Sequence, residues 1–110
     1  MENVDYAHFA KLDIRVGVVE GAENLEGSEK LVKMIVDFGE EVGERQVLAG
    51  LQKDYIAADL VGIKTLFLVN LEPKKMAGSE SQGMLLMADA NDKPVFVKPD
   101  EPCELGDKIC

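Results

Sequence analysis

Few side chains in this sequence are able to carry out covalent chemistry. His8 is the single histidine, and it lies far along the chain from the two cysteines, Cys103 and Cys110. Two thiols without a nearby histidine do not form a zinc site, and in a cytosolic protein they are expected to stay free and reduced. An enzyme needs a nucleophile, an acid–base pair or a metal. The sequence therefore predicts a protein without catalytic residues, bound metal or cofactor.

Two further segments have compositions that resemble sites for phosphate binding or for carboxylate chemistry. Gly78–Gly83 is rich in glycine and serine, but it lacks the lysine that a phosphate-binding P-loop requires. Glu40, Glu41 and Glu44 lie close together in the glycine-bounded segment Gly39–Glu44, which is typical of a solvated hairpin loop. Neither segment is expected to hold a cofactor or a reaction centre.

Basic side chains offer a better candidate, namely a site that binds phosphates. Lys74 and Lys75 are adjacent in a proline-started segment that follows the most apolar run of the chain, and they are expected to lie in a loop at one rim of a barrel. Lys30 and Lys33 flank the start of a predicted strand, and Arg15 is expected to point away from the apolar face of another. A small β-barrel that brings these cations to one face would offer a surface for a nucleic-acid backbone.

The net charge of −9 argues against indiscriminate binding of nucleic acid, because phosphate affinity comes from Lys and Arg. The acidic residues are concentrated at the two ends of the chain. Residues 1–29 hold seven acidic and two basic residues, and residues 89–110 hold six and three, whereas residues 30–88 hold eight and seven. The central part of the chain is therefore able to carry a local basic surface.

Short apolar-rich segments separated by turn residues are typical of a small antiparallel β protein. In the segment 31–38, for example, Val32, Met34, Val36 and Phe38 alternate with polar residues and share one face. Helices are expected over residues 6–12 and 54–60. Five to seven strands with a short helix between the third and the fourth predict an all-β OB-fold, a five-stranded Greek-key barrel with short helices. The predicted strands are Asp13–Val19, Leu31–Phe38, Arg45–Leu48, Lys64–Leu71, Gly83–Met87 and Pro94–Lys98.

The length of 110 residues suits one domain that spans residues 1–110. The composition, 46% apolar and 30% charged, is that of a folded and soluble chain rather than a disordered one. No apolar run approaches the ~18–20 residues that cross a bilayer. The N-terminus is acidic and lacks the basic and apolar regions of a signal peptide. We therefore expect a cytoplasmic protein that does not associate with membranes.

Several segments, in order along the chain, form a pattern that is known from other proteins. They are Phe9–Gly17 (FAKLDIRVG), Glu26–Leu31 (EGSEKL), Val47–Leu51 (VLAGL), Asp59–Gly62 (DLVG), Asn70–Lys75 (NLEPKK) and Gly78–Met84 (GSESQGM). Through these segments the sequence resembles the tRNA-binding domain family from residue 9 to about residue 109. That family comprises free-standing tRNA-binding proteins, C-terminal appendages of methionyl-tRNA synthetase, and a domain of the β chain of bacterial phenylalanyl-tRNA synthetase.

The resemblance implies an OB-fold without catalytic activity that recognises the shape of tRNA rather than its sequence. It also implies action beside methionyl-tRNA synthetase or as a free-standing protein, and a homodimer with the C-terminal segment at the interface. The strand-like tail Cys103–Cys110 is accordingly expected to cross to the partner subunit. Motif matching gives the candidate tRNA-binding residues, with Lys30, Lys74, Ser81 and Met84 first and Lys11, Arg15, Lys33, Arg45 and Lys75 in support.

Glu72 departs from the family pattern, because members commonly carry a basic residue at this position. An acid beside Lys74 and Lys75 weakens the attraction of phosphates. An alternative function therefore stays open, a homodimeric export-related chaperone that binds exposed peptide segments, for which the five methionines would supply an adaptable apolar surface. Structural roles also stay open for two of the candidates, because Ser81 could cap a turn and Met84 could lie in the core.

Overall fold

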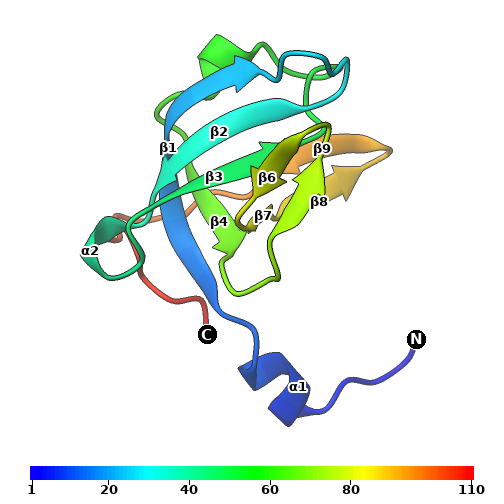
Figure 1. Cartoon of the computed structure of the whole chain (residues 1–110). Helices are drawn as coiled ribbons and strands as arrows, with labels where there is room; N and C mark the ends of the chain where they lie inside the picture. The colour runs from blue at the N-terminus through cyan, green and yellow to red at the C-terminus, as the bar shows by residue number, and fades with distance from the viewer.

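A five-stranded antiparallel sheet curls into a nearly closed barrel in the computed structural model, which describes residues 1–110. The strand order is β3-β2-β1-β4-β7, and β1 is long enough to pair with β4 through its first half and with β2 through its second half. A register shift between Val19 and Gly21 lets β1 bend between these two partners. The strands are β1 (Ile14–Asn24), β2 (Val32–Asp37), β3 (Glu44–Ala49), β4 (Lys64–Leu68) and β7 (Met84–Leu85) (Figure 1). The prediction of an all-β OB-fold is confirmed.

The remaining elements are short and lie around the barrel. A 3-10 turn, η1 (Ala57–Leu60), stands between β3 and β4, where the OB-fold pattern predicts a helix. Two separate hairpins follow β4, formed by β5 (Lys74–Met76) with β6 (Ser79–Ser81), and by β8 (Met87–Ala90) with β9 (Lys93–Phe96). The helix α1 (Tyr6–Ala10) stands away from the barrel in Figure 1 and buries none of its residues. A helical turn, α2 (Gly39–Val42), connects β2 to β3.

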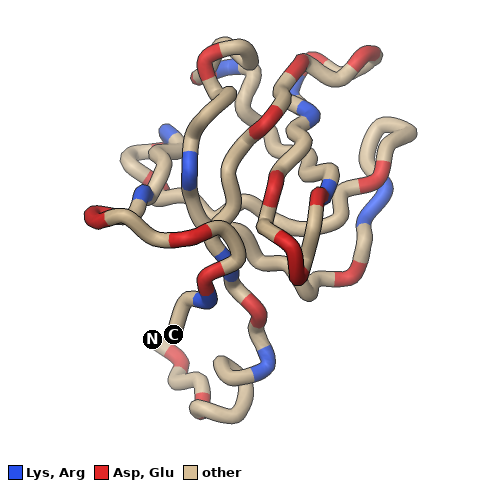
Figure 2. Tube along the Cα trace, turned by 90° about the vertical axis from the view of Figure 1, so that its left-hand side faces the viewer, with Lys and Arg blue, Asp and Glu red and all other residues tan.

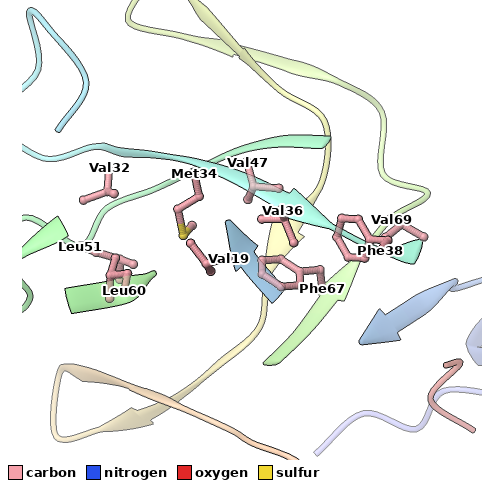
Figure 3. Close-up of a cluster of buried hydrophobic side chains, with 10 residues drawn as sticks. All are labelled: Val19, Val32, Met34, Val36, Phe38, Val47, Leu51, Leu60, Phe67 and Val69. Carbon is pink, nitrogen blue, oxygen red and sulfur yellow. The ribbon is translucent and has the colours of Figure 1, made fainter. Parts of the chain in front are cut away.

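The core lies inside the barrel and follows the alternation predicted for the second strand. Val32, Met34 and Val36 are completely buried, and their neighbours Lys33 and Ile35 are not. Figure 3 shows ten core side chains in one continuous cluster, with Leu51 and Leu60 at one end and Phe38, Phe67 and Val69 at the other. The rings of Phe38 and Phe67 meet edge to face at a centroid distance of 5.2 Å, a favourable aromatic geometry.

Gly17 of β1 lies directly over this core. A Cβ atom at position 17 would come within 2.7 Å of both Phe38 and Val36. Only glycine therefore lets β1 approach the two side chains that fill this end of the barrel.

The hairpin loop expected at Gly39–Glu44 joins the antiparallel strands β2 and β3, and it contains the helical turn α2 with Gly39 and Gly43 at positive φ. Two other predicted elements are corrected by the structure. The expected helix over residues 54–60 is only η1, since the extended Ile56 separates η1 from the hydrogen-bonded turn that ends at Tyr55. The expected strand Gly83–Met87 is divided at Leu86 between β7, which pairs with β4, and β8, which pairs with β9.

The C-terminal tail also differs from its prediction, because it pairs with β1 of its own chain. The N–H of Val16 donates to the carbonyl of Asp107 at 2.9 Å, and the N–H of Ile109 donates to the carbonyl of Ile14 at 2.8 Å. The first half of β1 has β4 on one side only, so its other side presents unpaired backbone groups that the tail satisfies. The expectation that this tail crosses to a partner subunit is therefore wrong.

Candidate nucleic-acid interface

Two of the predicted lysines belong to one row of residues that crosses four strands. Lys33 of β2 pairs with Leu48 of β3. The N–H of Leu48 donates to Ser81 Oγ of β6 at 3.0 Å, and Ser81 pairs with Lys74 of β5. We call these four residues the lysine row. At a strand spacing of about 4.8 Å, the backbones of Lys33 and Lys74 are roughly 15 Å apart, so the two ammonium groups are suited to separate phosphates.

Lys74 and Lys75 are not equivalent, although they are adjacent. They lie in β5 rather than in the predicted loop, and successive residues of a strand point to opposite faces. Lys74 shares its face with Ser81, whose hydroxyl reaches β3, so this face of the hairpin is turned toward β3. Lys75 lies on the other face, directly opposite Glu80. The carboxylate of Glu80 lowers the positive potential around Lys75 and leaves Lys74 as the more effective cation.

Ser81 is buried, with 5% of its surface exposed, and its hydroxyl has two backbone partners. It accepts from the N–H of Leu48 and donates to the carbonyl of Gly83 at 2.9 Å. These bonds hold β6 against β3, and they give Ser81 a structural role. Met84, by contrast, is 42% exposed at the surface rather than in the core. Its thioether is therefore available to a ligand that lies beside the lysine row.

Lys30 lies in the connection between β1 and β2, next to the start of β2. The turn that carries it is tightly bonded, because Ser28 Oγ accepts from the N–H groups of Lys30 and Leu31. The side-chain amide of Gln52 donates to the carbonyls of Ser28 and Leu31. Lys30 is exposed and has no acidic partner within salt-bridge distance. A fixed backbone and a free ammonium group suit it to binding phosphate.

Lys33 and Lys11 are less readily available than Lys30. Lys33 Nζ lies 2.9 Å from Glu23 Oε1 of β1, its partner in the sheet, and must leave this exposed ion pair to reach a phosphate. Exposed ion pairs contribute little, about 0–1 kcal/mol, so the exchange is inexpensive. Lys11 is exposed between α1 and β1, and its carbonyl accepts a hydrogen bond from the Asn70 side chain.

Arg15 is not presented to a ligand at all. Its guanidinium donates to Asp13 at 2.6 Å, to Glu41 at 3.0 Å and to the carbonyl of Gly106 at 3.2 Å. The hydrogen bond from Arg15 holds the pKa of Asp13 below its ordinary value, whereas burial opposes this shift. The three partners come from the start of β1, from α2 and from the tail. Arg15 therefore ties the tail to the barrel.

Arg15→Met is expected to lower the melting temperature and to loosen the tail while leaving the salt dependence of tRNA binding unchanged. The reason is that the substitution removes four hydrogen bonds but no exposed cation. Thermal unfolding, together with hydrogen exchange at Ile109 and Val16, measures the structural effect. The salt slope is the slope of the logarithm of the binding constant against the logarithm of the salt concentration. If Arg15→Met instead reduced this slope by about one, Arg15 would contact a phosphate.

Arg45 likewise bonds to the protein itself. Its Nη1 donates to the carbonyls of Val69 at 2.6 Å and Gln82 at 3.2 Å, so it joins the end of β4 to the segment that follows β6. The neighbouring Gln46 and Gln82 complete this contact, although neither was among the predicted residues. The single sequence signal for them was the position of Gln82 inside the motif Gly78–Met84.

Acidic residues surround these cations, and two of them, Glu20 and Glu44, interact with each other. A hydrogen bond with Glu44, reinforced by desolvation and by the charges of Glu44 and Asp37, raises the pKa of Glu20. Figure 2 shows Asp and Glu distributed over most of the chain, with Lys and Arg between them. A polyanion is therefore attracted only locally, at exposed lysines without an acidic partner in salt-bridge distance, such as Lys30 and Lys74.

Other kinds of site are not formed. No three His, Cys, Asp or Glu side chains come together in an arrangement that could hold a metal ion. His8 lies on α1, where Asp5 Oδ1 accepts from its N–H at 2.9 Å and caps the helix. None of the helices is both long and apolar enough to span a bilayer.

The fold defines the chain as an OB-fold barrel. Such barrels bind oligonucleotides on the face of strands 2 and 3 and with the loops beside it. Here Lys33 lies on β2, Lys30 lies in the connection that precedes β2, and Lys74 lies in the connection between β4 and β7.

Comparisons with known proteins agree with this class. The family model described as "Putative tRNA binding domain" matches residues 14–108, and the chain belongs to this tRNA-binding domain family. It is 40% identical over 109 residues to the methionine–tRNA ligase of Archaeoglobus fulgidus, and 46% identical over 103 residues to that of Methanothrix thermoacetophila. These alignments cover 99% and 94% of the chain, but only 16% and 15% of the two ligases, so the chain spans about one sixth of the length of these relatives.

Solved structures with the same fold include two kinds of protein. A methionyl-tRNA synthetase (MetRS) related protein from Pyrococcus horikoshii is 40% identical, with a TM-score of 0.91 and full coverage of both chains. The chaperone CsaA of Bacillus anthracis str. Ames is 30% identical, with a TM-score of 0.87, and the match covers 99% of this chain and 100% of that one. The family is thus established by sequence, and its members include proteins described in both ways.

Proposed function

We propose that this chain is a non-catalytic tRNA-binding module that acts beside methionyl-tRNA synthetase, either as a subunit or as a free-standing protein. The observation that supports this most is the lysine row, in which Lys33 lies on β2 and Lys74 lies in the connection between β4 and β7. OB-folds bind nucleic acid with the face of strands 2 and 3 and with the neighbouring loops. The exposed Lys30 and Met84 extend this surface. In this proposal the chain acts in protein biosynthesis in the cytoplasm.

Affinity in this proposal comes from phosphates, and selectivity comes from the shape of tRNA. A surface with two or three usable lysines contacts the backbone and has few groups that read base edges. The surrounding acids, Glu72 among them, keep the affinity low. A synthetase partner would compensate, because a bound module raises the local concentration of tRNA at the catalytic site.

The proposal is tested by a gel-shift assay with total tRNA at two salt concentrations, beside an unfolded polypeptide as competitor. We expect binding that weakens steeply with salt and that the polypeptide does not displace. Glu72→Lys should bind more tightly at low salt, because an acid beside the lysines becomes a base. Binding that is independent of salt, or a Glu72→Lys protein no tighter than the parent, contradicts the proposal.

We propose further that the chain forms a homodimer through α1 and the residues around it. Tyr6 is 80% exposed, Phe9 41% and Leu12 43%, although all three are large and apolar. A five-residue helix that buries nothing against its own barrel has little stability by itself, so a second copy of the chain is its natural partner.

Light scattering under reducing conditions is expected to give twice the 12.0 kDa of one chain. Phe9→Ser with Tyr6→Ser should reduce the mass to one chain while the barrel still folds, because neither side chain is buried within its own chain. Tyr6 and Phe9 lie at a ring distance of 6.3 Å on one side of α1, so the pair is removed together. A monomeric parent protein rules out this dimer.

The peptide-binding chaperone is retained as a second candidate because of a specific observation. Leu71 and Met84 are both more than two fifths exposed. Leu71 lies shortly after the end of β4, and Met84 is the first residue of β7. Two chaperone structures share the fold at 30% identity. If the unfolded polypeptide binds tightly and displaces tRNA in the gel-shift assay, this candidate replaces the first.

A further inference from the structure

The seam that closes the barrel between β3 and β6 relies on side chains. β3 is an edge strand of the sheet, and residues 80–82 run beside it. One bond of the seam joins two backbones, since the N–H of Gln82 donates to the carbonyl of Gln46 at 2.7 Å. The next two use side-chain acceptors: the N–H of Gln46 donates to Gln82 Oε1 at 2.9 Å, and the N–H of Leu48 donates to Ser81 Oγ at 3.0 Å.

Two side chains of β3 donate further hydrogen bonds across the seam. Gln46 Nε2 donates to the carbonyl of Glu80 at 2.8 Å. Arg45 Nη1 donates to the carbonyls of Val69 and Gln82. The segment between these two carbonyls, residues 70–81, contains both Lys74 and Lys75. Arg45 therefore holds the two ends of this segment in place.

The β5–β6 hairpin needs this support because it has no ladder to the main sheet. It forms a separate two-stranded sheet, and an isolated two-stranded hairpin is only marginally stable in water. Its angle to the barrel decides whether the face with Lys74 or the face with Lys75 is turned toward β3. The seam bonds at Glu80, Ser81 and Gln82 set this angle.

We propose that Arg45, Gln46 and Gln82 are positioning residues for tRNA binding, which touch no tRNA themselves and hold Lys74 beside β3. This inference rests on the proposed tRNA-binding function. It gives Arg45 a role different from that of a phosphate contact, because both hydrogen bonds from its Nη1 go to protein carbonyls. A lysine at position 45 keeps the charge, but its side chain is one bond shorter, so its ammonium does not reach the point from which Arg45 Nη1 donates to both carbonyls.

The test is a double-mutant cycle in the full chain between Arg45→Lys and Lys74→Ala, with total tRNA as the probe and the dissociation constant measured at two salt concentrations. We expect Arg45→Lys to weaken binding roughly five- to tenfold and to reduce the salt slope by about one, although the net charge is unchanged. Adding Lys74→Ala to Arg45→Lys should cause little further loss, because Lys74 is already displaced. Hydrogen exchange at the β5–β6 amides should accelerate.

Gln46→Met provides an independent variant in case Arg45→Lys does not fold. It removes only the bond to the exposed carbonyl of Glu80, and it should weaken tRNA binding in the same non-additive way with Lys74→Ala. If the two losses add, or if Arg45→Lys binds as tightly as the parent, the inference is overturned and the proposed function remains. If the parent protein binds no tRNA, both fail together.

Discussion

Lys74→Ala is expected to weaken the binding of every tRNA alike, by roughly tenfold at about 50 mM salt. Each phosphate contact multiplies the association constant by a factor that varies as roughly the −0.7 to −0.9 power of the salt concentration. Between about 1 M and 50 mM salt, one contact is therefore worth about a factor of ten. The salt slope should fall by about one, and the melting temperature should not change, because Lys74 is exposed. Filter binding with several purified tRNAs measures the effect.

Lys75→Ala is the matched control for this prediction. It removes the same charge from the neighbouring residue, but from the face of β5 that is turned away from β3 and lies opposite Glu80. We expect an effect of less than threefold, because Lys75 lies outside the lysine row and Glu80 opposite it offsets part of its attraction for phosphate. Equal losses for the two variants would show that the tRNA contacts both faces of the hairpin, which contradicts the assignment of the site to the lysine row.

The sequence predicted the barrel well because the barrel depends on local alternation. Val32, Met34 and Val36 are apolar at every second position, and this pattern alone decides which face of β2 is buried. The tail and the helical turn α2 were not predictable in the same way. The tail binds β1 because one side of that strand would otherwise be unpaired, which depends on the order of strands in the folded sheet.

The candidate site was predictable in its composition but not in its geometry. The motif Gly78–Met84 pointed to Ser81 and Met84, yet only the fold separates the buried hydroxyl of one from the exposed thioether of the other. Arg15 looked available in sequence. Its partner Asp13 is only two residues away, but its other partners, Glu41 and Gly106, are 26 and 91 residues away. Long-range pairs of this kind are formed by the tertiary structure and leave no local signal.

Met84→Ala is expected to weaken tRNA binding at every salt concentration while leaving the salt slope and the melting temperature unchanged. Met84 is 42% exposed beside the segment that carries Ser81, so its thioether can pack against an unstacked base or a ribose. Covering about 40 Å² of apolar surface at about 25 cal/mol per Å² gives about 1 kcal/mol, or roughly fivefold in Kd. The salt slope stays the same because no charge is lost.

Met34→Ala makes the same chemical change at a position inside the barrel, where Met34 is completely buried among the core side chains. It should lower the free energy of unfolding by about 2–5 kcal/mol, because truncation of a buried methionine loses apolar burial and leaves a cavity. Below its melting temperature the folded variant should still bind tRNA like the parent. Measurements of tRNA binding and calorimetry on the two variants thus distinguish a methionine at the ligand surface from a methionine in the core. A fall in melting temperature for Met84→Ala comparable to that of Met34→Ala would place Met84 in the structural core and remove it from the candidate interface.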